Sequence, residues 1–214
     1  MPGIFSNRIQ RRNSSKKHLA VGLVLLAGVS LFGCSQQASS HGLANNASSG
    51  SVPAKVTIVS DKESGTPLII SGTIYAPDGQ TPLEGINLFV YQTDATGVYS
   101  TGGNNGDNRD TRIHGVVRSG ADGRYEFRTI KPGSYPASRN PAHIHAYVSG
   151  PNYPEYWIDE YHFADDPFVT DEVRTKAGTG RFSSILTLTR GADGVLRGVR
   201  DIKVERCSRN CTGR

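Results

Sequence analysis

Two histidines separated by one residue, His143 and His145 in "NPAHIHAYVSG", are the residues of this sequence best suited to chemistry. The residues around them are typical of a β-strand, in which successive side chains point to opposite faces. His143 and His145 should therefore share one face, and Ile144 should point to the other. Such a pair can bind a metal ion or form a polar stripe on a half-exposed sheet, and this stretch alone favours the polar stripe.

The elements that would position these histidines are short β-type runs separated by turn signals such as "PDGQ" and "GADG", starting at about Val52. Strands are expected at residues 55–60, 67–76, 86–94, 113–119, 124–130, 142–149, 181–189 and 195–205. Residues 153–163 fit a short helix or an irregular strand, and no long helical periodicity or internal repeat is present. Residues 52–206 are thus predicted to form one all-β domain, a single antiparallel β-sandwich.

Residues 1–33 have the pattern of a secretory signal. A basic, acid-free start precedes the apolar run 19–33, which is short for a membrane span. The basic residues are Arg8, Arg11, Arg12, Lys16 and Lys17. Cys34 follows "LFG" as in a bacterial lipoprotein signal, so lipidated Cys34 would be the mature N-terminus; an uncleaved N-terminal anchor is the alternative.

The residues that follow Cys34 predict where the domain is held. Ser35 resembles the pattern for sorting to the outer membrane, and residues 34–51 are rich in Ser, Ala and Asn, as in a flexible tether. The predicted location is the cell envelope, with the protein anchored to the membrane by lipid on Cys34, or secreted, and not the cytoplasm.

The net charge of +5 comes entirely from the segment before Cys34, because 19 Lys and Arg balance 19 Asp and Glu in the rest of the chain. The chain from Cys34 onward therefore has no net positive charge, and no nucleic-acid partner is expected.

Cys207 and Cys211, in the C-terminal tail 207–214, are expected to form a small disulfide loop in an oxidising compartment. A C-x-x-x-C metal or redox site is the alternative.

Three segments carry a resemblance to a known family. They are "YQTDATGVYS", "DGRYEFRTIKPGSYP" and "NPAHIHAYVSG", and residues 66–167 as a whole resemble the intradiol ring-cleavage dioxygenases, the family of protocatechuate 3,4-dioxygenase. The family pattern contains "D-G-x-Y-x-F-R-T-I-x-P-G-x-Y-P" followed by "R-P-x-H-I-H". The hairpin around "PDGQTPLEG" is also similar to the opening hairpin of transthyretin-like sandwiches, which is the fold that the resemblance implies.

The resemblance implies a mononuclear non-haem Fe(III) cofactor with the metal ligands Tyr99, Tyr135, His143 and His145. Ferric iron is a hard cation, and phenolate oxygen is a ligand that it favours. The implied substrates are a catechol-type aromatic and O2, and the implied product is a cis,cis-muconate-type diacid. Tyr99 would leave the metal when the catechol binds and accept one of its protons.

This sequence departs from the family at two candidate catalytic positions. Asn140 stands where the family usually has an arginine that stabilises the substrate, and Arg139, one position earlier, is the candidate for that role. Glu160 stands where a glutamine behind the ligands is typical, so a carboxylate would alter the charge near the metal.

Four further residues near the predicted site have open roles. His114 and His162 are expected to form hydrogen bonds rather than to bind the metal. Tyr156 and Trp157 either line a pocket or pack in the core.

Three functions are consistent with these observations. The leading hypothesis is an envelope-located intradiol dioxygenase. The first alternative is a non-catalytic transthyretin-like module that binds catechols or ferric iron, and the second is a structural envelope protein, for which a four-ligand set would be unnecessary. The identity of the catechol and the oligomeric state are open.

Overall fold

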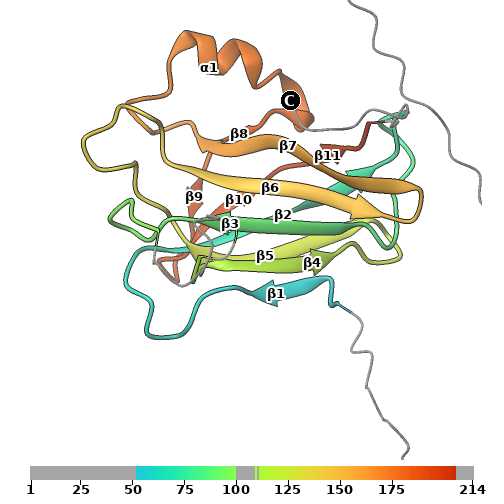
Figure 1. Ribbon diagram of the computed structural model, residues 1–214, viewed down its shortest axis with the longest axis horizontal. Coiled ribbons are helices and arrows are strands. Elements are labelled where there is room, and N and C mark those ends of the chain that lie inside the picture. The colour runs from blue at the N-terminus through green and yellow to red at the C-terminus, as the bar shows by residue number, and fades with distance from the viewer. Residues whose placement is uncertain (1–51, 100–108, 110, 206–214) are drawn as a thin grey trace, which may run out of the picture. The chain divides into compact units, whose positions relative to one another are not determined.

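The computed structural model of the protein describes residues 52–99, 109 and 111–205 (Figure 1). These residues contain eleven strands, one short α-helix, α1 (Asp171–Lys176), and a 3-10 turn at Gly180–Phe182. The strands are β1 (Lys55–Thr57), β2 (Pro67–Tyr75), β3 (Asn87–Gln92), β4 (His114–Arg118), β5 (Arg124–Ile130), β6 (His143–Gly150), β7 (Tyr153–Phe163), β8 (Ile185–Leu186), β9 (Thr189–Arg190), β10 (Leu196–Val199) and β11 (Ile202–Lys203).

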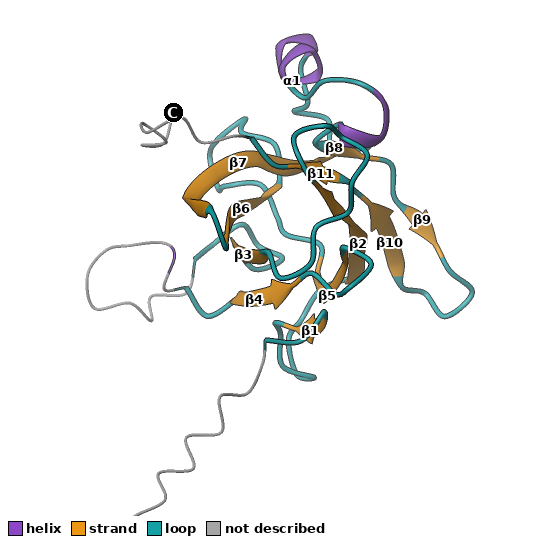
Figure 2. Ribbon diagram, turned by 90° about the vertical axis from the view of Figure 1, so that its right-hand side faces the viewer, coloured by secondary structure: helices purple, strands orange, loops and turns teal. Residues whose placement is uncertain are grey.

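The strands form two sheets, which Figure 2 shows as separate layers. One sheet has the order β1-β5-β2-β10-β9, and β11 also pairs with β2; the other has the order β4-β3-β6-β7-β8. The described residues are nearly all-β, in agreement with the predicted fold class. β6, which carries the two histidines, lies in the middle of the second sheet.

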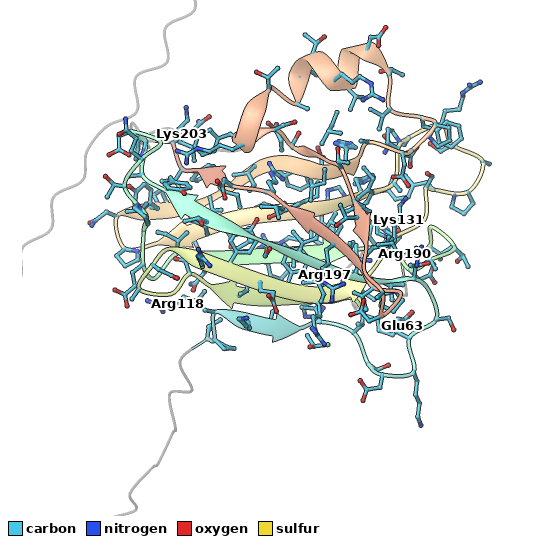
Figure 3. The ribbon with its side chains drawn as sticks, turned by 180° about the vertical axis from the view of Figure 1, so that it is seen from behind. Glu63, Arg118, Lys131, Arg190, Arg197 and Lys203 are labelled. Atoms are coloured by element: carbon cyan, nitrogen blue, oxygen red, sulfur yellow. The ribbon has the colours of Figure 1, made fainter. Side chains whose placement is uncertain are left out.

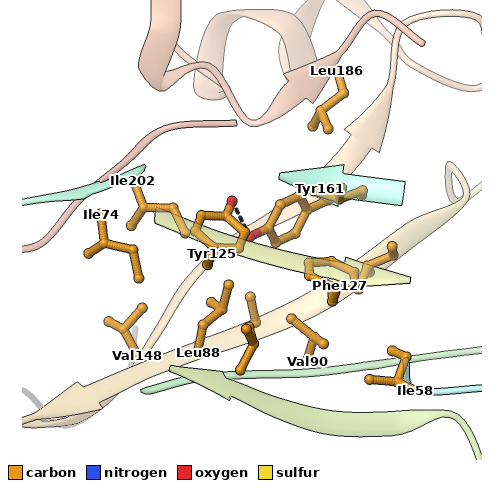
Figure 4. Packing of buried hydrophobic residues seen from close by; sticks show 14 of the residues in the cluster. Ile58, Ile74, Leu88, Val90, Tyr125, Phe127, Val148, Tyr161, Leu186 and Ile202 are labelled. Atoms are coloured by element: carbon orange, nitrogen blue, oxygen red, sulfur yellow. Dashed lines mark hydrogen bonds between the residues drawn. The ribbon is translucent and has the colours of Figure 1, made fainter. Parts of the chain in front are cut away.

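The core fills the space between the sheets. Leu68 of β2 and Phe127 of β5 meet Val90 of β3 and Ile144 of β6, and all four are fully buried. The phenol groups of two core tyrosines, Tyr125 and Tyr161, lie 3.0 Å apart, as Figure 4 shows. Since Ile144 points into this core, strand alternation turns His143 and His145 to the outer face of their sheet.

The prediction of a purely antiparallel sandwich is wrong. β1 pairs with β5, β10 and β11 pair with β2, and β7 pairs with β8, all in parallel. Parallel neighbours need long connections, and strands at these positions come from distant parts of the chain. The alternation of apolar residues is the same for both directions, so the sequence pattern did not distinguish them.

Of the two alternatives for residues 153–163, the irregular strand is confirmed, because β7 has shifts of register against β6. Two other expected segments differ in detail. In place of the expected strand 181–189 the structure has the 3-10 turn, the two-residue strand β8 and the first residue of β9. The expected strand 195–205 is interrupted at Arg200, whose backbone carbonyl accepts a hydrogen bond from the Tyr125 hydroxyl at 2.7 Å.

A close approach at Gly72 gives a prediction about stability. A Cβ atom at Gly72 would overlap the backbone carbonyl of Arg200. Gly72→Ala is therefore expected to lower the free energy of unfolding by about 3 kcal/mol, as overpacking does. Urea denaturation measures the change, with Gly120→Ala as the control because a Cβ there meets only ordinary contacts. Equal midpoints for the two variants would contradict the prediction.

The face of the six-stranded sheet away from the core carries charged side chains, among them Arg190 and Arg197 (Figure 3). Arg197 is paired with Asp193 at 2.6 Å, and Lys55 with Glu126 at 3.5 Å. A hollow of about 530 Å³ opens on this sheet, and none of its lining residues belongs to the sheet that carries the histidines.

No helix in the described part of the chain is long and apolar enough to cross a membrane. The predicted signal, the tether with Cys34 and the cysteine pair Cys207 and Cys211 lie outside the described residues. Their roles stay predictions.

Candidate metal centre

The two histidines of β6 point their Nε2 atoms toward each other, 3.2 Å apart. Their ring planes are nearly perpendicular, at 82°. His143 Nδ1 lies 2.6 Å from the backbone carbonyl of Pro141. A carbonyl only accepts, so Nδ1–H is the donor, and the neutral ring presents the lone pair of Nε2 to the site.

Two loops bring the predicted tyrosines to the same point. Tyr135 follows β5, and its hydroxyl oxygen lies 3.1 Å from His143 Nε2 and 3.4 Å from His145 Nε2. Tyr99 follows β3, and its hydroxyl oxygen lies 2.9 Å from His145 Nε2 and 2.8 Å from the Tyr135 oxygen. The four residues that the sequence singled out as ligands are therefore brought together.

Backbone contacts hold the two tyrosine loops against each other. Gly133 donates its N–H to the carbonyl of Asp94 at 2.9 Å, and the Thr93 hydroxyl donates to the carbonyl of Gly133 at 3.0 Å. Gly97 has a positive φ of 82°, and a Cβ there would overlap the carbonyl of Ser134. The loops can approach this closely only with glycine at position 97.

Aromatic side chains enclose the His145 ring. Tyr91, which is its register partner on β3, stacks on the ring with centroids 4.5 Å apart. Trp157 of β7 meets it edge-on at 4.8 Å. Tyr91 was not among the predicted site residues, although its place opposite His145 on the same face follows once β3 and β6 are known to pair.

Burial sets the protonation of the centre. It raises the pKa of Tyr99 above the ordinary value of 10.0, with the hydrogen bond to Tyr135 acting in the same direction. Burial also lowers the pKa of His143. The phenol therefore stays protonated unless a cation is close, whereas the imidazole is already neutral, as metal binding requires.

The donor atoms fit a hard metal ion. Ligands about 2 Å from one metal ion stand roughly 3 Å apart, and the contacts found among these four atoms are 2.8 to 3.4 Å long. Within the described residues no group of three or more His, Cys, Asp or Glu is placed to hold a metal, and the phenol oxygens of Tyr99 and Tyr135 lie beside the two histidine nitrogens. Two phenolates and two neutral imidazoles would supply two negative charges, which suits a ferric ion.

Glu160 lies behind His145. Its Oε1 is 3.7 Å from His145 Nδ1, which is buried and has no hydrogen-bond partner. The interaction with His145 is the largest cause that lowers the pKa of Glu160, to about 2. A carboxylate thus stands next to one candidate ligand, as expected from the sequence.

Arg139 does not contact the four candidate ligands in the described structure. It is exposed, and its guanidinium lies 5.8 Å from the ring centre of Phe168. Asn140 is also exposed.

The other singled-out residues separate into two groups. His162 lies next to the centre, with its ring 6.0 Å from that of His143, and Trp157 lines it. Tyr156 belongs to the core, where its hydroxyl accepts from the N–H of Glu205 at 2.8 Å. His114 is exposed beside the Thr111 carbonyl.

Comparison with known proteins agrees with this geometry. A sequence model of the family described as "Dioxygenase" matches residues 44–200. Catechol 1,2-dioxygenase 1 of Acinetobacter lwoffii is 31% identical over 134 residues, which is 55% of this chain and 42% of that protein. The protocatechuate 3,4-dioxygenase beta chain of Burkholderia cepacia is 28% identical over 116 residues, covering 49% and 48%. The chain thus spans about half the length of these curated relatives.

A solved structure is similar over a larger share. The dioxygenase domain of a dioxygenase and carbohydrate-binding protein fusion from Streptomyces sp. SirexAA-E has a TM-score of 0.56 and 26% identity, covering 73% of this chain and 90% of that one. The fold and donor set define a class of two-sheet β-proteins with two tyrosines and two histidines at one centre. The family match is specific: this chain belongs to the intradiol dioxygenase family.

Proposed function

We propose that the protein is a non-haem Fe(III)-dependent intradiol dioxygenase that cleaves catechol-type rings with O2. One observation carries the proposal: the oxygens of Tyr99 and Tyr135 and the Nε2 atoms of His143 and His145 each lie within 3.4 Å of at least two of the others. The named activities of the matched relatives support it. The product would be a cis,cis-muconate-type diacid.

The residues of the centre would have distinct tasks. Bound ferric iron would act as a Lewis acid toward the two catechol oxygens. The Tyr99 oxygen, as a phenolate, would accept a proton from a catechol hydroxyl. Tyr91 and Trp157 would keep the His145 imidazole aimed at the centre, because they contact it from two directions. Glu160 would place a negative charge behind His145.

Arg139 is proposed to contact the substrate, because it is adjacent to the position where the family has an arginine. With this role, Arg139→Ala should lower kcat/KM by about tenfold, the loss of one charge-assisted hydrogen bond. Steady-state O2 uptake measures it. An unchanged kcat/KM would assign Arg139 to the solvated loop surface instead.

Oxygen consumption tests the proposed activity. Iron-loaded protein with catechol should consume one O2 for each catechol and yield the ring-opened diacid, identified by mass spectrometry. Protein treated with an iron chelator is the control. An iron-loaded protein that binds catechol without consuming O2 would favour the non-catalytic binding module. Asn140, which replaces the family's arginine, is the sequence feature that supports this alternative. A protein that binds neither iron nor catechol would favour the second alternative, a structural envelope protein.

The proposed location gives a prediction of its own. Cys34→Ala should move the protein from the membrane fraction to the soluble envelope or secreted fraction, because lipid on Cys34 is the proposed anchor. Fractionation and the mass of the mature N-terminus measure this, and Cys207→Ala is the control. A Cys34→Ala protein that stays in the membrane would support the uncleaved anchor.

A further inference from the structure

The turn that follows β7 contains a buried carboxylate that the catalytic proposal does not use. Asp166 is 9% exposed, and both of its oxygens accept hydrogen bonds. Oδ1 accepts from the N–H of Phe168 at 2.8 Å. Oδ2 accepts from the N–H of Ala142 at 2.8 Å and from the hydroxyl of Ser134 at 3.4 Å. The carboxylate thus joins three segments.

Two of these contacts end next to candidate ligands. Ser134 directly precedes Tyr135, and Ala142 directly precedes His143. Asp166 thus bonds to the Tyr135 loop through Ser134 and to the residue just before β6 through Ala142. A displacement of Asp166 would therefore act on the distance between the Tyr135 oxygen and His143 Nε2, which is 3.1 Å.

A purely local role for Asp166 explains only one contact. The bond to Phe168 spans two residues and is a common way for Asp to stabilise a turn. The bonds to Ala142 and Ser134 span 24 and 32 residues. The bond to Phe168 is enough to close the turn. The two long-range bonds have a different effect, because they fix two distant segments relative to each other.

The same turn has a second, weaker connection to the Tyr135 loop. Asp165 pairs with Lys131 at 2.6 Å, and Lys131, labelled in Figure 3, is the first residue after β5. The Asp165 side chain is 65% exposed, so this ion pair is expected to contribute little. Asp165 is thus a matched control for Asp166.

We propose that Asp166 is a positioning residue that sets the separation between the Tyr135 loop and the His143 end of β6. Its importance for metal binding rests on the proposed function, but the geometric claim does not. Asparagine cannot replace it, because an amide has one acceptor oxygen and its NH2 group would face the N–H of either Ala142 or Phe168. Ala142 is 3% exposed, so water cannot substitute freely.

The first test uses metal-free protein. NMR should detect an NOE between the Tyr135 and His143 rings in the wild type and in Asp165→Asn. In Asp166→Asn a displacement of about 0.5 Å, the tolerance of a preorganised site, should reduce this NOE by roughly half. An unchanged NOE in a folded Asp166→Asn protein would overturn the proposal. If that variant fails to fold, Ser134→Ala takes its place, and an unchanged NOE there would overturn it equally.

The second test measures Fe(III) affinity and the visible absorption of the iron-loaded proteins. Asp166→Asn should bind iron about 10–100-fold more weakly than Asp165→Asn and show a shifted absorption band. Equal affinity and equal spectra would overturn the positioning role. A wild type that binds no iron would contradict the proposed function alone, since the NOE comparison still decides the role of Asp166.

Discussion

Replacing His143 by Ala is expected to abolish iron binding and ring cleavage together. His143 contributes one of four donors, and its Nε2 lies within 3.2 Å of the donor atoms of Tyr135 and His145. The loss should exceed the roughly 10–100-fold that follows removal of an outer hydrogen-bond partner. Iron per chain after Fe(III) reconstitution and the rate of O2 uptake measure the two effects.

His114→Ala is the matched control for this prediction. His114 is an exposed histidine of β4, which β3 separates from β6, and its loss should leave iron content and rate unchanged. A His143→Ala protein that keeps its iron and its activity would show that the β6 histidines are a polar stripe on a sheet.

Replacing Tyr99 by Phe is expected to separate iron binding from turnover. Tyr99 is the ligand proposed to leave the metal when catechol binds, so it is the least needed of the four donors for holding iron. With Tyr135, His143 and His145 in place, most of the iron should be retained. The proton acceptor for the catechol hydroxyl is lost, and general-base catalysis typically contributes about 10²–10⁴-fold. The fall should therefore appear in kcat, measured by O2 uptake at saturating catechol, together with a changed visible spectrum.

Tyr156→Phe provides the comparison for Tyr99→Phe. It also removes one buried hydroxyl, but that hydroxyl accepts from the N–H of Glu205 in the core, away from the centre. A small loss of stability and an unchanged kcat are expected. If Tyr99→Phe turns over as fast as Tyr156→Phe, Tyr99 does not handle a substrate proton.

The parts of the fold that could be predicted are those set by local patterns. The strand expected at 124–130 coincides with β5, because a "GADG" turn and a Pro-Gly turn delimit it. The outward direction of His143 and His145 follows from the period of two residues in a strand. The ligand set itself followed from a family resemblance, since neither tyrosine is distinctive alone.

The parts that could not be predicted depend on contacts between distant segments. The parallel pairing of β10 with β2 leaves no trace in the alternation of either strand. The stacking of Tyr91 on His145 requires the register of β3 against β6. Asp166 looks like an ordinary turn residue until its bonds to Ser134 and Ala142 are seen.

The most direct test of the proposed function is the visible spectrum of the purified protein with its iron quantified, recorded before and after anaerobic addition of catechol. Tyrosinate-to-Fe(III) charge transfer should colour the protein burgundy, catechol should move the band to longer wavelength, and admission of O2 should bleach the shifted band as the diacid forms. A colourless protein that takes up no iron during Fe(III) reconstitution would contradict the assignment of Tyr99, Tyr135, His143 and His145 as ligands.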